Sequence, residues 1–339
     1  MPSTAEILAA TATRPLPPGH RCFIVQLSRL QPCLEKAAAA RVAAPALYST
    51  PARQWLFQLQ ALCRIYKKAQ DKKPFKKMAE PIKALEDQLG AVDYWDGWRK
   101  AAVGMKDFPS VMLAGIERHL RTELDALETI LRDGAWLAND LERLATMLEE
   151  LAEVDWHEAK RDRHDVRDFL VEELQELESA YHEGVFDFEE LEDGVHEFRR
   201  KIRWFSIYAQ SLEGLVQLKP IARPDAVLRR YLTTAVVESR FNALPPPQVG
   251  TQPLRFEAPH FYALSWLIAE LGIIKDDGQK CVAFAGLAEE SGWSGSIAGL
   301  LSDVRNPLDA IPKTVEERVR EFVDEAGVLR RLASDLSGT

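Results

Sequence analysis

The segment 194–205, GVHEFRRKIRWF, holds the densest set of groups in the chain that can bind an anion. On a helical wheel, its apolar residues share one face and its cationic residues share the other, namely His196, Arg199, Arg200 and Arg203. Cations this close repel one another unless an anion or carboxylates lie opposite. Because the planar arginine fork suits phosphate oxygens, and a histidine beside phosphates gains charge, the pattern predicts a site for a phosphate-rich anion.

The segment 51–68 repeats this design in the first part of the chain. Its apolar residues again share one face, and the opposite face carries Arg53, Arg64, Lys67 and Lys68. Two helices of the same design at separate places indicate an internal duplication.

The elements that must position these residues are helices. Apolar residues recur at three- and four-residue spacing, with hardly any alternating β-branched run, so we expect an all-α fold. Helices are expected over residues 20–43, 51–70, 74–91, 109–132, 137–154, 157–182, 186–213, 223–241, 257–273, 279–290, 296–305 and 314–335.

The segment 195–203 resembles the pattern VHxxRVxxRRLR of the conserved histidine α-helical domain (CHAD) family, with matches at His196, Arg199 and Arg203. In the first half, Arg53 stands at the position of the first arginine. Segments 89–96 and 271–276 are similar to the LGxxRDxD segment of the same family. The sequence departs from the family pattern, which has histidine or mostly basic residues there, at Thr50, Phe57, Gln58, Gln60, Trp204 and Ser206.

The resemblance implies two helical bundles related by a pseudo-twofold, with the histidine helices lining a basic groove. On this basis we expect a flexible tail over residues 1–19, a first repeat over 20–134, a connecting helix over 135–156 and a second repeat over 157–335. The implied activity is non-catalytic binding of inorganic polyphosphate, or of similar phosphate- or sulfate-like anions, without a cofactor.

The charge distribution leaves an alternative open. Residues 149–197 carry 19 acids against four Lys and Arg, a net charge of −15, whereas residues 64–83 carry eight Lys and Arg against two acids, a net charge of +6. If the chain's own carboxylates neutralise the basic helices, the protein is instead a degenerate scaffold that binds a protein partner.

Other classes of function find little support in the sequence. The total charge of −9 argues against a nucleic-acid binder, and no apolar run is long enough for a membrane span. Near His157 and His164 an arginine replaces the residue that a metal site needs, so no metal is expected. The sequence contains neither an ExExK nor a GxSxG motif, so no known catalytic motif predicts an enzyme. The first residues lack the features of a secretory signal, and the four cysteines, expected to be reduced and mostly buried, form no CxxC pair, so we expect a cytoplasmic protein.

Overall fold

The structure is a computed structural model that describes residues 3–70, 72–247 and 251–338. The chain forms two compact units: unit 1 comprises Met1–Asp162 and Leu287–Gly295, and unit 2 comprises Arg163–Gly286 and Ser296–Thr339. Helices dominate both units, which confirms the predicted all-α class. Within the described ranges, no helix combines the length and the apolar character that a membrane crossing requires.

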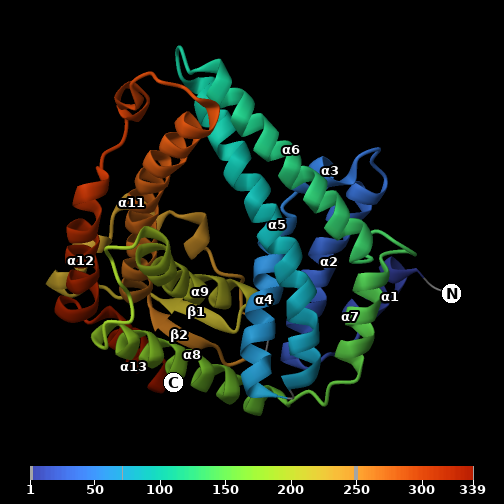
Figure 1. The fold of residues 1–339 in the computed structure, drawn as a ribbon. Helices are drawn as coiled ribbons and strands as arrows, with labels where there is room; N and C mark the ends of the chain where they lie inside the picture. The colour runs from blue at the N-terminus through green and yellow to red at the C-terminus, as the bar shows by residue number, and fades with distance from the viewer. Residues whose placement is uncertain (1–2, 71, 248–250, 339) are drawn as a thin grey trace. The chain divides into compact units, whose positions relative to one another are not determined.

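Unit 1 is built from helices that pack with their long sides together. Figure 1 shows α2, α4 and α5 side by side with similar axis directions. The helices of this unit are α1 (Thr4–Ala12), α2 (Pro18–Ala38), α3 (Ala43–Tyr48), α4 (Ala52–Ala69), α5 (Lys72–Gly104), α6 (Ser110–Asp133) and α7 (Glu142–Ala152).

Aromatic rings form the centre of unit 1. The ring centroids of Phe23 and Phe75 lie 5.6 Å apart, and the ring of Trp156 lies 5.4 Å from Tyr66 and 5.7 Å from Phe75. Gly19 allows α2 to approach this cluster, because a Cβ atom there would lie 2.6 Å from the Tyr66 ring. The four cysteines are all buried and free, as the sequence predicts.

The segment expected to be a flexible tail contains helix α1. Its N-terminus is a capping box, in which the Ser3 side chain accepts a hydrogen bond from the Glu6 backbone and the Glu6 side chain accepts one from the Ser3 backbone. Thr4 and Leu8 are buried. The capping box and these two anchors make Thr4–Ala12 part of the folded unit, which corrects the expectation of a flexible tail for residues 4–12.

Unit 2 combines two long helices with many short elements. The long helices are α8 (Ala159–His182), counted with this unit from Arg163, and α11 (Ala258–Ser291), counted with it as far as Gly286. The other helical elements are the π-helix η1 (Leu191–His196), α9 (Glu197–Ser211), η2 (Ala226–Tyr231), α10 (Thr234–Val237), η3 (Arg240–Asn242), η4 (Ile297–Leu301), η5 (Leu308–Ala310), α12 (Ile311–Arg320), the π-helix η6 (Glu321–Glu325) and α13 (Val328–Ser337).

The expected helix over 223–241 is wrong, because its own side chains divide it. Asp225, Thr233 and Ser239 each accept a hydrogen bond from a backbone N–H two or three residues ahead, so each begins a new short element, respectively η2, α10 and η3. On either side of this region lie two strands that sequence reasoning missed. β1 (Val216–Lys219) and β2 (Leu254–Glu257) pair in parallel, with Val216 opposite Leu254.

The expected break between helices 257–273 and 279–290 is absent, since α11 is continuous. Two of its glycines serve close packing instead of ending the helix. A Cβ atom on Gly278 would lie 2.9 Å from side-chain atoms of both Ile311 and Leu191, and one on Gly272 would lie 3.1 Å from Nη2 of Arg199. Glycine thus brings η1, α9 and α12 against the backbone of α11.

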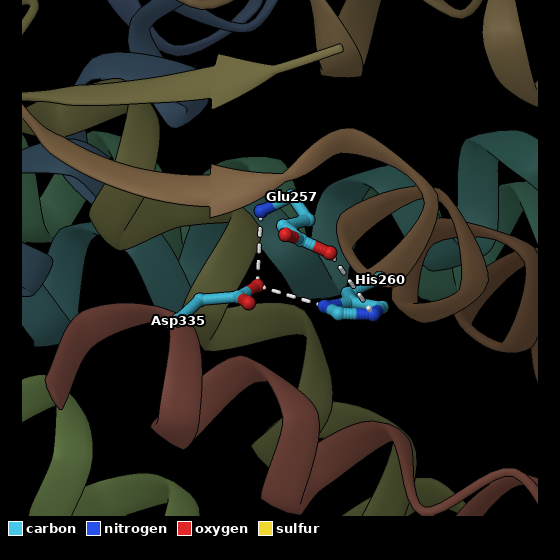
Figure 2. A group of neighbouring side chains, drawn as sticks. All are labelled: Glu257, His260 and Asp335. Carbon is cyan, nitrogen blue, oxygen red and sulfur yellow. Dashed lines mark hydrogen bonds and ion pairs between the residues drawn. The ribbon is translucent and has the colours of Figure 1, made fainter. Parts of the chain in front are cut away.

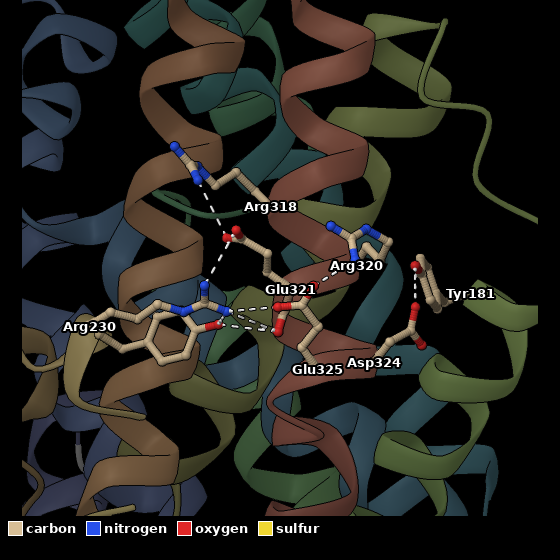
Figure 3. Close-up of polar contacts among 8 residues, drawn as sticks. Tyr181, Arg230, Arg318, Arg320, Glu321, Asp324 and Glu325 are labelled. Carbon is tan, nitrogen blue, oxygen red and sulfur yellow. Dashed lines mark hydrogen bonds and ion pairs between the residues drawn. The ribbon is translucent and has the colours of Figure 1, made fainter. Parts of the chain in front are cut away.

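A polar network fixes η2 to the π-helix η6 (Figure 3). The Arg230 guanidinium lies 3.3 Å from Oε1 of Glu321, which also pairs with Arg318, and the Tyr231 hydroxyl donates to the Glu321 carbonyl at 3.3 Å. Arg320 pairs with Glu325 at 2.6 Å. The expected single helix over 314–335 is therefore divided into α12, η6 and α13, with Gly327 in a left-handed conformation before α13.

We expect Gly194→Ala to lower the free energy of unfolding by about 1–3 kcal/mol, because the added Cβ would overlap the backbone carbonyl of Asp187. The matched control is Gly286→Ala in α11, where no neighbour lies within 4 Å. That change should raise stability by up to about 1 kcal/mol, the ordinary helix preference for alanine. Urea unfolding of both variants tests this, and equal stabilities would contradict the close packing at Gly194.

Candidate functional site

Helix α9 places the predicted anion-binding residues at the edge of a buried apolar face. Phe198, Ile202 and Phe205 are buried and hold the helix in the core of unit 2. His196 is the last residue of η1, and the arginines follow within the next two turns of α9. The sequence-based division of this helix into two faces is therefore reproduced.

The buried face also accounts for two departures from the family pattern. Trp204 is buried and stacks on Tyr208 with ring centroids 5.8 Å apart, and Ser206 is buried beside them in the helix. A charged residue at either position would lose its hydration on burial. On α9, the basic residues are thus limited to the exposed edge of the helix.

Arg199 is the central residue of this edge. Its guanidinium is half-buried against α11, where Nε donates a hydrogen bond to the carbonyl oxygen of Ile268 at 3.0 Å and Nη2 approaches Gly272. Burial lowers the pKa of this guanidinium, and Asp276 opposes that shift. In the part of the chain that the structure describes, no carboxylate makes an ion pair with Arg199. The charge is partly desolvated, its hydrogen bond goes to a neutral carbonyl, and Asp276 acts on it without forming an ion pair.

His196 lies among these cations. Its Nδ1 is 3.4 Å from a carboxylate oxygen of Glu192 and makes no hydrogen bond to a described residue. Burial lowers the pKa of the imidazole, Glu192 raises it, and the charges of Lys275, Arg199 and Arg200 lower it further. Lys275, which belongs to α11, is a cation of this site that sequence reasoning did not select.

The neighbouring cations have carboxylate partners. Arg200 pairs with Glu197 at 2.6 Å, and Lys275 pairs with Asp276 at 2.8 Å. Arg203 is half-buried and interacts with other groups of the chain. Arg199 is therefore the residue whose charge is least compensated on this face.

Unit 1 contains a similar arrangement in which the charge is fully compensated. Arg53 on α4 lies against Gly90 of α5, pairs through Nε with Glu86 at 2.9 Å, and pairs through Nη1 with Asp93 at 2.9 Å. Glu86 is four residues before Gly90, just as Ile268 is four residues before Gly272. An internal duplication would produce this correspondence, and the duplication itself stays a prediction.

The remaining predicted cations of unit 1 lie at the other end of α4. Arg64, Lys67 and Lys68 are exposed, and Arg64 and Lys68 have partners within the chain. At a rise of about 1.5 Å per residue, Arg64 is roughly 16 Å along the helix from Arg53. The side chains at the family's other basic positions are held in the fold: Gln58 and Gln60 are buried, and Phe57 lies under the Arg53 guanidinium at 5.4 Å. Unit 1 therefore does not gather the predicted basic residues into one site.

A separate cluster in unit 2 contains ligand types that bind metals: Glu257, His260 and Asp335 (Figure 2). One Asp335 oxygen accepts hydrogen bonds from the Glu257 backbone N–H at 2.9 Å and interacts with Nδ1 of His260 at 2.8 Å. Glu257 lies 3.7 Å from the other ring nitrogen. The two carboxylates thus face opposite nitrogens of one imidazole, at the positive N-terminal end of α11, an arrangement that suits a clamp between α13 and α11 better than a cation site.

In comparisons with known proteins, no family model, no curated protein and no solved structure matches this chain. The resemblance to the CHAD family therefore stays a prediction that rests on the residues described above.

We expect Arg53→Ala to destabilise the protein by about 1–3 kcal/mol, because it leaves the buried carboxylate of Glu86 without its charged partner. Adding Glu86→Gln should recover part of that loss, since a neutral amide is less costly to bury. Chemical denaturation of the two single variants and the double variant measures this coupling. Strictly additive effects would show that the Arg53–Glu86 pair contributes nothing.

Proposed function

We propose that the protein is a non-catalytic module that binds phosphate groups of a polyanion, such as inorganic polyphosphate, at the exposed edge of α9 beside α11. The observation that carries the proposal is the half-buried guanidinium of Arg199, which has no carboxylate partner among the described residues. His196 lies close enough to Arg199, Arg200 and Lys275 for their charges to lower its pKa. The resemblance of segment 195–203 to the CHAD family favours the same class of ligand.

Phosphate oxygens can supply the negatively charged hydrogen-bond acceptors that Arg199 lacks among the described residues. A charge-assisted hydrogen bond contributes about 1.5–3 kcal/mol, and the arginine fork can donate two such bonds to one phosphate group. Arg199 already has its Nε position fixed on Ile268, so less side-chain entropy is lost when its remaining N–H groups bind an anion. No nucleophile or acid–base pair is needed for this binding.

The proposed site is smaller than the groove that the family resemblance implies. In unit 1, Arg53 forms ion pairs with Glu86 and Asp93. In unit 2, the family's basic positions are taken by the buried residues Trp204 and Ser206. A few phosphate groups of a longer chain therefore contact the protein, with His196, Arg199 and Arg200 as their main partners.

A second function is favoured by the pairing in unit 1. The two carboxylates on Arg53 fill an anion position from within the protein, and Glu197 does the same for Arg200. If Arg199 also binds no anion, the protein is instead the degenerate scaffold that the charge distribution leaves open as an alternative, and its surfaces bind a protein partner.

The polyanion proposal predicts measurable binding of long-chain inorganic polyphosphate in a calorimetric titration at low salt. Raising the salt concentration should weaken the binding strongly, because counterion release contributes to the affinity. The triple variant His196→Ala, Arg199→Ala and Arg200→Ala should lose the binding. Arg121→Ala, which removes an exposed arginine of α6, should bind like the unaltered protein.

Arg53→Ala is informative in the same titration, because the Arg53 guanidinium already pairs with the carboxylates of Glu86 and Asp93 and should not bind the polyanion. Its affinity for polyphosphate should stay within about twofold of the unaltered protein. If the unaltered protein gives neither heat nor a rise in melting temperature at low salt, the polyanion function is wrong and the scaffold function gains.

The His196 environment predicts a pH dependence of binding. Its pKa is lowered in the free protein, mainly by burial, so the imidazole is largely neutral at neutral pH. Bound phosphate favours the charged imidazole, so affinity should rise as the pH falls below about 6.5, the ordinary histidine value. Titrations at several pH values should show this rise and proton uptake. His196→Asn should remove both, and an unchanged pH profile would exclude the residue from the site.

A further inference from the structure

A second surface of unit 2 contains a cavity with mostly apolar residues in its walls, beside the polar Gln217 and Asn242. Its volume is about 380 Å³, which is within the range of pockets that hold a small ligand. It lies among β1, the short elements after it and the start of α11. The apolar residues that form its walls include Ile221, Pro224, Leu232, Val237, Leu244 and Tyr262.

Some apolar residues in the part of the chain that lines this cavity are exposed. Val227, Val237 and Phe241 are 40%, 42% and 54% exposed, all within one short stretch of the chain. Among the described residues, Phe241 is the only phenylalanine in the exposed class. Single exposed apolar residues are ordinary, but a cluster beside a cavity is typical of an interaction surface.

Unpaired cations lie around the same surface. The stretch 219–242 carries five Lys and Arg against two acids. Four of these cations are exposed and form no ion pair with a described residue, namely Lys219, Arg223, Arg229 and Arg240. The nearby Arg230 and the α12 arginines are paired instead, as Figure 3 shows. The surface therefore suits an acidic partner with an apolar anchor.

The chain itself contains a segment with this chemistry in the loop 183–190. Gly184 adopts a left-handed conformation at the end of α8, and the Val185 N–H donates to the Ala180 carbonyl at 3.0 Å, which closes the helix in a Schellman motif. Val185 is nevertheless 62% exposed. Exposed carboxylates without an ion pair to any described residue surround it: Glu183, Asp187, Glu189 and Glu190.

We propose that this acidic loop of one copy docks on the basic apolar surface of a second copy of the chain. Val185 enters the cavity beside Ile221, Leu232 and Leu244, and the loop carboxylates face Arg223 and Arg240. The Schellman motif holds the loop in a fixed conformation, so little conformational entropy is lost on docking. This self-association is independent of polyanion binding, because it uses neither His196 nor Arg199.

Sedimentation velocity over a range of protein concentrations, at low and high salt, tests the proposal. The average mass should rise with concentration toward two or more chains, and added salt should shift the association to higher concentration. If the loop of each copy docks on the other copy, a closed dimer forms. If each loop docks on a further copy, an open-ended oligomer forms. A protein that stays monomeric throughout overturns the proposal and leaves the cavity to another acidic partner.

Matched variants separate this interface from other self-association. Val185→Ser should weaken association at least tenfold, whereas Val282→Ser, at a valine of α11 that is 58% exposed, should not. The reversals Arg223→Glu with Arg240→Glu should abolish it. Mixing that protein with one carrying Glu183→Lys and Glu189→Lys should restore association between the two species. This rescue excludes misfolding as the cause, and its failure, or association that survives Val185→Ser, contradicts the proposed contact.

Discussion

The packing of an arginine guanidinium against a helical glycine is the constraint on which the proposed anion site depends. Without a Cβ at Gly272, Arg199 can lie on the backbone of α11 and reach the Ile268 carbonyl. The same packing removes water from the charge, so a compensating group becomes valuable. If that group is a carboxylate of the protein, the arginine is neutralised internally. If it is a ligand, the surface can bind an anion.

The two units differ in the groups that compensate the half-buried arginine. In unit 1, Glu86 and Asp93 compensate Arg53, so the guanidinium acts as a structural connection between α4 and α5. In unit 2, Ile268 lies four residues before Gly272, as Glu86 lies before Gly90, and it offers its backbone carbonyl to Arg199. Among the described residues, the two carboxylates that neutralise Arg53 have no ion-paired counterpart at Arg199, which is the guanidinium proposed to bind an external anion.

The irregular part of unit 2 gives the molecule a second kind of surface. Side-chain caps divide the stretch 223–241 into short elements, which leaves apolar residues at the surface instead of on the buried face of one amphipathic helix. The π-helices have a comparable effect, since η1 positions His196 and η6 brings its carboxylates to Arg230. Departures from regular helix geometry therefore position both the proposed anion site and the proposed docking surface.

The sequence alone determined the all-α class, most helices of unit 1, and the two faces of α9, because each follows from spacing along the chain and from side-chain polarity. It could not determine that Trp204 and Ser206 are core residues, that α11 is continuous, or that residues 4–12 are helical. These outcomes depend on what packs against each residue. In the same way, a helical wheel identifies the face that carries Arg53 and Arg199, but only the tertiary structure places Glu86 and Asp93 on one arginine and the Ile268 carbonyl on the other. The partners are 33, 40 and 69 residues away in the chain, so no local pattern encodes them.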